Sequence, residues 1–264
     1  MLITQKTSRA IESCIANSHL SNCKKYQELG SPVAFERIGS GVTNYTGQDS
    51  FLSQVIGWGF DVDADMVEKE LNAIEQFYRK QRHHSIDIEL SPLCGLTVIK
   101  ALAGRGYLVS ELNNISILDL EMYQASKRCD ALKIIETSEA EIQSWASCVA
   151  EGFGCPEAAG QFDVYAQSQG IRAYHAIIDD HIAACATIAI HGDICDLGVT
   201  STLEAFRGLG LQKALIEHRL NYAKAQGVRL ATVTTEPGSI SDLNIQKCGF
   251  HCAYTRIKFS KKIE

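Results

Sequence analysis

The chain lacks several features that would place it among membrane or nucleic-acid-binding proteins. No apolar stretch approaches the roughly 20 residues that a membrane-spanning helix needs. Residues 1–10 are polar and carry no apolar core of a secretion signal. The formal net charge of -6 leaves no excess of Lys and Arg for binding phosphate backbones. We therefore expect a cytoplasmic protein that has neither a membrane nor a nucleic acid as its partner.

The chain also lacks the paired cysteines of a metal or disulfide framework. It has ten cysteines, but no Cys-x-x-Cys unit occurs. Several of them, such as Cys148, Cys185 and Cys195, lie inside apolar runs. This distribution is typical of buried, reduced thiols in a cytosolic protein. We expect no structural zinc and no other bound metal.

Length and hydrophobic patterning indicate two domains with a similar order of strands, helices and turns. A chain of 264 residues can form two compact domains of about 130 residues. Polarity rises near residues 121–130, which predicts domains at 1–127 and 128–264. A strand, a proline, a short helix, a glycine–aromatic pair and a strand describe residues 86–118 and again residues 230–259. Such an internal repeat favours two copies of one α+β fold.

Hydrophobic spacing and turn residues place the main elements. The expected helices cover 7–18, 22–29, 66–82, 91–102, 139–151, 156–169, 211–226 and 241–248. The expected strands of the second half include 194–202, 229–235 and 251–259.

A glycine-rich turn at residues 206–215 joins a predicted strand to a predicted helix. Its glycines allow several backbone N–H groups to point into one concavity, and a helix N-terminus adds about half a positive charge. Arg207 and Lys213 add two cations. No Gly-Lys-Ser/Thr follows, and the third glycine of a dinucleotide fingerprint is absent. The turn therefore predicts a pyrophosphate site, with an ordinary strand-to-helix turn as the alternative.

At this turn the chain resembles the GNAT family of N-acetyltransferases, whose signature is Gln/Arg-x-x-Gly-x-Gly/Ala. Arg207, Gly210 and Gln212 stand at its three positions, and Gln212 departs from the usual small residue. The resemblance extends over residues 132–259 and is only a weak echo over residues 1–125. It implies two tandem GNAT-like domains, with a degenerate copy first, and acetyl-CoA as the cosubstrate.

The resemblance also implies which residues hold coenzyme A. The strand before the turn splays from its neighbour in this family, and its main chain pairs with the pantetheine arm. Asn244 lies off the usual family position, so packing of its helix is an alternative role. The implied cofactor-binding residues are Thr200, Thr202, Arg207, Gly208, Leu209, Gly210, Leu211, Gln212, Lys213, Ser241 and Asn244.

Amide formation from a thioester needs a base for the amine and a proton for the departing thiolate. Many family members donate that proton from a Tyr at the position of Ile245, which cannot donate. Tyr254 or water could replace it, with a buried structural role as the alternative for Tyr254. Asp196 stands where some members carry a carboxylate base, and Glu236 at the end of the next strand is a second candidate. A solvated acid is the alternative for each.

The first half lacks an equivalent cradle. Residues 57–66 correspond to the turn, but they carry Asp61, Asp63 and Asp65, whose charge repels a pyrophosphate. We expect this half to bind no coenzyme A and to line the substrate cleft or mimic a dimer partner.

These patterns predict transfer of an acetyl or short acyl group from acyl-CoA to a primary amine. The acceptor would be a small molecule, an amino acid or a peptide, and the chain a monomer or homodimer. A catalytically silent acyl-CoA sensor is an alternative, because Ile245 replaces the usual acid. A protein-modifying acetyltransferase is a third reading, for which the sequence shows no docking feature.

Overall fold

The computed structural model describes residues 3–48, 50–124 and 132–263. The chain folds into two compact units. The first comprises Met1–Ile115, Thr235–Asp242 and Cys252–Glu264, and the second comprises Ser116–Thr234 and Leu243–His251. The predicted domain boundary between residues 127 and 128 lies outside the described residues.

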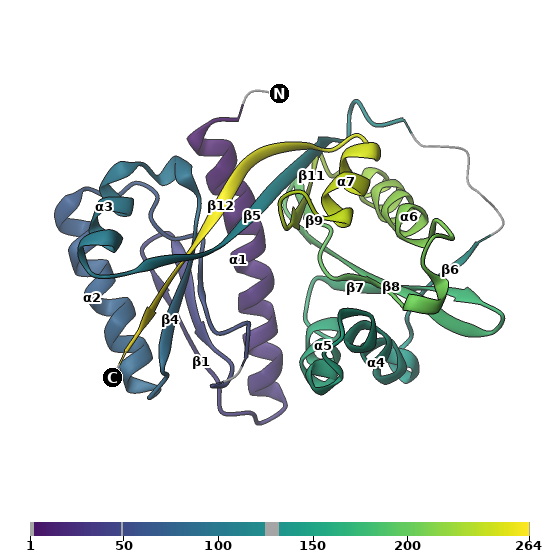
Figure 1. Cartoon of the computed structure of the whole chain (residues 1–264), viewed down its shortest axis with the longest axis horizontal. Helices are drawn as coiled ribbons and strands as arrows, with labels where there is room; N and C mark the ends of the chain where they lie inside the picture. The colour runs from purple at the N-terminus through teal and green to yellow at the C-terminus, as the bar shows by residue number, and fades with distance from the viewer. Residues whose placement is uncertain (1–2, 49, 125–131, 264) are drawn as a thin grey trace. The chain divides into compact units, whose positions relative to one another are not determined.

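The first unit is a mixed sheet with strand order β1-β2-β3-β4-β12-β5, flanked by helices (Figure 1). Strand β12, from the C-terminal part of the chain, pairs antiparallel with β4 from Ile257–Leu90 to Lys262–Ser85. Its elements are α1 (Gln5–Glu28), β1 (Ala34–Ile38), β2 (Gly41–Tyr45), β3 (Val55–Ile56), α2 (Ala64–Lys80), β4 (Ser85–Leu90), η1 (Pro92–Cys94), α3 (Leu96–Gly104), β5 (Leu108–Asp119) and β12 (His251–Lys262).

The second unit is a mixed sheet with strand order β5-β11-β9-β8-β7-β6, and β10 pairs with β8. Strand β5 enters this unit with its final residues, which follow Ile115. Its other elements are β6 (Lys133–Glu136), η2 (Glu139–Glu141), α4 (Ile142–Phe153), η3 (Pro156–Ala158), α5 (Ala159–Ala166), β7 (Ile171–Ile178), β8 (His181–His191), β9 (Ile194–Asp196), β10 (Thr200–Thr202), η4 (Glu204–Phe206), α6 (Leu211–Ala225), β11 (Leu230–Thr235) and α7 (Ile240–Lys247).

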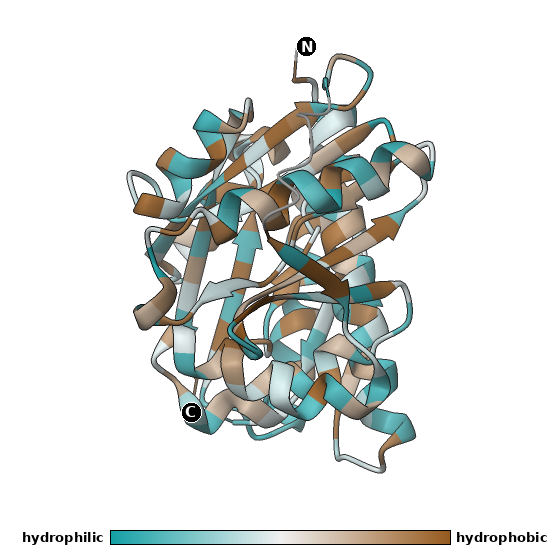
Figure 2. Cartoon of the chain, turned by 90° about the vertical axis from the view of Figure 1, so that its right-hand side faces the viewer, coloured by the Kyte–Doolittle hydropathy of each residue, from teal (hydrophilic) through white to brown (hydrophobic). Residues whose placement is uncertain are grey.

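Helices cover both faces of the second sheet. Helices α6 and α7 pack on one face, where Leu215 and Leu220 are fully buried against β8 and β11. Helices α4 and α5 pack on the other face, where the Trp145 indole donates a 3.0 Å hydrogen bond to the Tyr174 carbonyl. The helices mix hydrophilic and hydrophobic residues along their lengths, as elements with one buried face do (Figure 2).

Helix α1 is continuous, whereas the sequence predicted two helices with a break near residue 20. Ile11, Ile15, Ser18 and Asn22 are buried at helical spacing, so one buried stripe runs through the polar segment that suggested the break. The stripe holds the helix together because packing of one face outweighs the weak propensity of a few polar residues. Neither α1 nor any other described helix is long and apolar enough to cross a membrane.

The N-terminus of α2 is closed by the chain's own carboxylates. The Asp63 side chain caps the helix and accepts a 2.8 Å hydrogen bond from the Met66 amide. Asp61, just before it, forms an ion pair with Arg9 of α1. The positive end of α2 is thus already neutralised within the first unit.

We predict that Asp63→Ala lowers the free energy of unfolding by about 0.5–2 kcal/mol, because the helix loses its N-cap acceptor. Urea denaturation followed by circular dichroism measures this. Lys69→Ala, an exposed change in the middle of the same helix, is the matched control and should stay within about 0.5 kcal/mol of the parent. Equal stability of the two variants would contradict the capping role.

Candidate functional site

The predicted strand 194–202 is interrupted by a β-bulge. Along β8, Asp196 of β9 pairs with Ala189 and Thr200 of β10 pairs with Ala186. Four steps on one strand therefore face three on the other, which leaves one extra residue in the segment 197–199. A bulge of this kind bends a strand and redirects its edge.

Beyond the bulge, the strand separates from its parallel neighbour. Strand β9 pairs with β11 up to Asp196–Thr232, and the Leu197 amide donates a 2.8 Å hydrogen bond to the Thr232 carbonyl. Strand β10 pairs with β8 alone among the described strands. One edge of β10 is consequently left without a strand partner, next to the place where β11 diverges.

The register turns the backbone groups of two predicted residues toward this edge. The Val199 carbonyl accepts from the Thr187 amide, and the Leu203 amide donates to the Ala183 carbonyl, so these residues bond toward β8. Antiparallel pairing alternates, so the intervening Thr200 and Thr202 direct their N–H and C=O groups away from β8.

A buried arginine of α6 stabilises the bulge through hydrogen bonds to β8 and β10. The Arg219 side chain donates to the Leu215 carbonyl (3.0 Å), the Thr187 carbonyl (2.7 Å) and the Thr200 hydroxyl (3.0 Å). Its burial lowers the pKa of Arg219 to about 10, and attraction to Asp196 acts in the opposite direction. In the sequence, Arg219 stands out only as part of the family resemblance. An Arg in a predicted helix gives no sign that it is buried against the bulge.

The glycine-rich turn lies exposed between η4 and α6. Gly208 and Gly210 have φ values of 82° and 77°, which side-chain-bearing residues adopt at a cost. A β-carbon on either glycine would meet no atom within 4 Å. The backbone of the turn therefore faces open space.

The N-terminus of α6 is open, in contrast to that of α2. Its N-cap residue is Gly210, and no side chain caps the helix. Within the described residues, no backbone acceptor takes the amide protons of Gly208, Leu209, Gly210 or Leu211. A helix start without a cap leaves its amide donors and its positive dipole end available to an anion.

Two cations flank this open helix start. The Arg207 guanidinium donates to the carbonyls of Thr202 (3.4 Å) and Gly152 (3.3 Å), which fixes its charge beside the turn. Lys213 is 68 % exposed and lies 3.8 Å from the Glu217 carboxylate. The turn thus offers both hydrogen-bond donors and positive charge.

Helix α7 is tied to the first turn of α6. The Asn244 side chain donates a 2.8 Å hydrogen bond to Oε1 of Gln212. This contact fits the packing alternative, and a contact of Asn244 with coenzyme A stays a prediction. Ser241 lies one turn earlier in α7 and is half-buried.

The loop after β11 carries Glu236 and is held by a carboxylate that the sequence did not single out. Asp242 is buried and accepts from the Thr235 hydroxyl (3.0 Å), the Gly238 amide (3.1 Å) and the Asn114 side chain (3.4 Å). Glu236 itself is exposed. The loop is thus anchored on both sides of an acid that faces water.

Tyr254 has a structural role in the first unit. It is buried, and its hydroxyl donates a 2.8 Å hydrogen bond to Glu12, which lies 3.5 Å from Arg256. Burial raises the pKa of Tyr254 well above its ordinary value. A phenol held this way is a poor proton donor, which favours the structural alternative.

Two further positions of the second unit, Ile245 and Cys195, are buried. Ile245, at the usual position of the acid, is 2 % exposed and belongs to the core under α6. Burial raises the pKa of the Cys195 thiol to about 12, which keeps it protonated and unreactive. Over the described ranges, no group of three or more His, Cys, Asp or Glu side chains could hold a metal ion.

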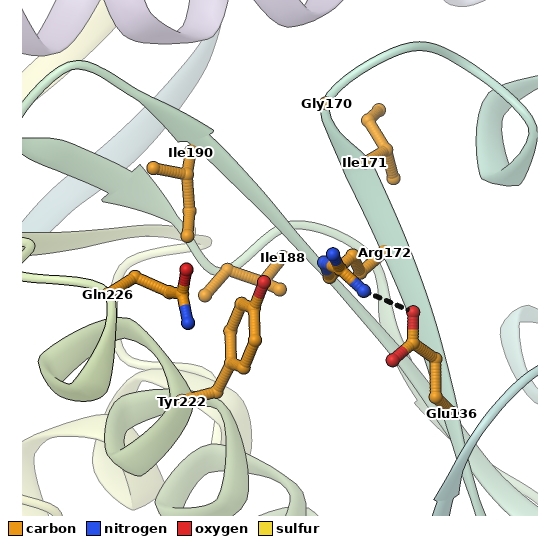
Figure 3. Close-up of a pocket in the computed structure, with 8 residues that line it drawn as sticks. All are labelled: Glu136, Gly170, Ile171, Arg172, Ile188, Ile190, Tyr222 and Gln226. Carbon is orange, nitrogen blue, oxygen red and sulfur yellow. Dashed lines mark hydrogen bonds and ion pairs between the residues drawn. The ribbon is translucent and has the colours of Figure 1, made fainter.

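A cavity of about 460 Å³ lies beside the C-terminal half of α6 (Figure 3). The Arg172 guanidinium crosses it, paired with Glu136 at 2.6 Å and placed over the Tyr222 ring. Tyr222 is eleven residues beyond Leu211, which is about 16 Å along a helix axis. The lining contains no predicted site residue and comprises Glu136, Gly170, Ile171, Arg172, Ile188, Ile190, Tyr222 and Gln226.

Comparison with known proteins identifies the fold. Residues 140–250 match the model of the Acetyltransferase (GNAT) family. A GCN5-related N-acetyltransferase from Kribbella flavida is similar over 92 % of this chain and 95 % of its own, with a TM-score of 0.67 and 16 % identity. A tandem GNAT protein from the clavulanic acid biosynthesis pathway is similar over 92 % and 87 %, with a TM-score of 0.63 and 16 % identity.

A protein of Staphylococcus epidermidis described as functionally unknown is similar over 90 % of this chain and 98 % of its own, with a TM-score of 0.62 and 10 % identity. No curated protein matches the chain by sequence. At these identities the structural likenesses show the fold, and they confirm the predicted α+β class with a GNAT-like first unit.

We predict that Arg219→Met lowers the free energy of unfolding by about 1–3 kcal/mol, because the buried carbonyl of Thr187 loses its donor. Thermal and urea denaturation measure the loss. The control is Arg229→Met, which removes an exposed ion pair to Asp193 and should cost less than about 1 kcal/mol. Similar losses in both variants would show that Arg219 does not support the bulge.

Proposed function

We propose that the chain transfers an acetyl or short acyl group from acyl-CoA to a primary amine, a proposal supported by the match of residues 140–250 to the model of the Acetyltransferase (GNAT) family. The observation that carries the proposal is the uncapped N-terminus of α6 behind an exposed glycine turn. An unsatisfied helix start is normally capped by a side chain, which is worth about 1 kcal/mol. Leaving it open makes sense where a ligand supplies the acceptor.

A coenzyme A pyrophosphate suits this turn. The amides of residues 208–211 would donate to its oxygens, and the dipole of α6 favours its negative charge. Arg207 and Lys213 would neutralise the remaining charge. Gln212, fixed by Asn244, would hold the first turn of α6 in place rather than contact the phosphates directly.

The pantetheine arm would lie along the free edge of β10. Thr200 and Thr202 direct their backbone N–H and C=O groups toward that edge, and the amides of pantetheine can pair with them as an added strand would. The thioester would then reach the bulge at residues 197–199. No strand occupies the edge of β10 among the described residues, so the arm has a place to bind.

Asp196 is the better supported of the two bases. It ends β9 at the bulge and is 8 % exposed, so its carboxylate lies at the proposed position of the thioester and away from bulk water. Glu236 is exposed on its loop. A general base acts within hydrogen-bond reach of the proton that it removes, which favours the group at the bulge.

We predict that the chain binds acetyl-CoA and that Arg207→Ala and Lys213→Ala each weaken binding about tenfold, or about 1.4 kcal/mol. Isothermal titration calorimetry measures both. Lys247→Ala, an exposed cation at the end of α7, is the charge-matched control and should bind as the parent does. No binding of acetyl-CoA at millimolar concentration would overturn the proposal, and equal affinity of all four proteins would remove the cradle from it.

We also predict that Asp196→Asn lowers kcat by about 10²-fold, while Glu236→Gln changes it less than threefold. The assay follows thiol release from acetyl-CoA with a panel of primary amines. Acetyl-CoA affinity should be retained in both variants. The reverse ranking would transfer the base to Glu236, and parental rates in both would eliminate the two acids.

A further inference from the structure

A tyrosine of α5 reaches the bulge from the face opposite α6. A β-carbon placed on Gly198 would lie 3.1 Å from the Tyr165 hydroxyl and 3.7 Å from Oδ2 of Asp196. Both side chains therefore come within reach of the same backbone position in the middle of the bulge. Tyr165 is half-buried, so part of its side chain remains open to solvent.

Gly198 permits this approach by leaving space rather than by its backbone conformation. Its φ is not among the positive values of the chain's glycines. A β-carbon would lie 2.9 Å from the Thr187 hydroxyl and 3.1 Å from that of Tyr165, closer than such contacts normally are. Any side chain at residue 198 would push these hydroxyls away from the bulge.

The Thr187 hydroxyl is an unpartnered group at the same place. Thr187 is completely buried, and its Oγ1 has no hydrogen-bond partner among the described residues. A buried hydroxyl without a partner costs stability, so a partner gained during function would account for it. Because it lies beside the position that the Tyr165 hydroxyl approaches, a negative charge formed there would supply that partner.

We propose that Tyr165 donates the proton to the departing CoA thiolate, and that the Thr187 hydroxyl stabilises the phenolate that results. This inference rests on the proposed acetyl transfer. It provides the acid that Ile245 cannot supply and that Tyr254, bound to Glu12, does not offer. The donor comes from α5 rather than from α7.

The proton balance closes within the second unit. Asp196 takes one proton from the ammonium of the acceptor, and the neutral amine attacks the thioester carbonyl to form a C–N bond. The tetrahedral intermediate breaks its C–S bond, and the sulfur takes the proton of Tyr165. The phenolate then removes the second proton from the nitrogen of the product amide. Asp196 releases to solvent the proton that it took from the ammonium. The products are the amide, free CoA thiol and one proton.

The surrounding charges favour this order. Asp196 is neutral once it holds the amine proton, so it no longer repels a phenolate beside it. Arg219, which donates to the Thr187 carbonyl and the Thr200 hydroxyl, remains a nearby cation throughout. A fixed donor and a fixed charge at the site of a developing anion lower its energy without reorganisation.

The test is Tyr165→Phe in the full chain, assayed by thiol release from acetyl-CoA with the amine panel and with water alone. We expect kcat to fall about 10²-fold, while KM for acetyl-CoA and its calorimetric affinity stay within twofold. Tyr222→Phe removes another half-buried hydroxyl, at the separate cavity, and should leave kcat unchanged.

Two further variants address the hydroxyl's position and its partner. Gly198→Ala should reproduce the fall in kcat, whereas Gly160→Ala, on the exposed side of α5, should not. Thr187→Val should lower kcat about tenfold without lowering the melting temperature, because it removes a hydroxyl that the resting protein leaves unpaired.

The outcomes distinguish the proton-donor role of Tyr165 from the proposed acetyl transfer on which it rests. A Tyr165→Phe protein that binds acetyl-CoA and keeps the parental kcat overturns the donor role and leaves the transferase intact. A parent protein that binds acetyl-CoA but releases no thiol, with any amine or with water, overturns the transfer function and the donor role together.

Discussion

One extra residue between Asp196 and Thr200 governs the geometry of the second unit. It divides one strand into β9 and β10. Strand β9 pairs in parallel with β11, whereas β10 pairs with β8 and lies apart from β11. An exposed strand edge is a liability for a soluble protein, because its unpaired amides and carbonyls invite another chain. Here the edge is short, and the buried guanidinium of Arg219 on α6 donates to the Thr187 carbonyl of β8 and to the Thr200 hydroxyl of β10. The bulge is therefore a maintained feature rather than a local irregularity.

The two units solve the same problem at a helix start in opposite ways. In the first, Asp63 caps α2 and Asp61 pairs with Arg9, so carboxylates of the chain itself neutralise the positive end of the helix. In the second, α6 begins at a glycine without a cap and is flanked by cations. The difference arises from a few side chains on a shared strand–turn–helix plan. The same plan thus gives a closed helix start in one unit and an open one in the other.

Much of the fold and of the candidate site could be predicted from the sequence, because local sequence rules determine these features. The glycine turn, the start of α6 at Leu211 and the α+β class follow from spacing and turn chemistry. The bulge was not predicted: Gly198 within residues 194–202 is a residue that can mark one, but the extra residue is defined only by the pairing with β8. The contacts of Arg219 with Thr187 and Thr200, and the contact of Asp242 with Asn114, also depend on residues far apart in sequence. Tyr165 gave no signal, because its relation to Gly198 exists only once α5 packs on the sheet.

The pairing of β12 with β4 has a consequence for how the protein is made. The residues of the second unit are nested between segments of the first, whose strand β12 follows the whole second unit in the sequence. Domains usually fold in the order in which a ribosome delivers them, the N-terminal one first. In this protein β4 of the first unit must wait for its partner until β12 has been synthesised, and by then the whole second unit has left the ribosome.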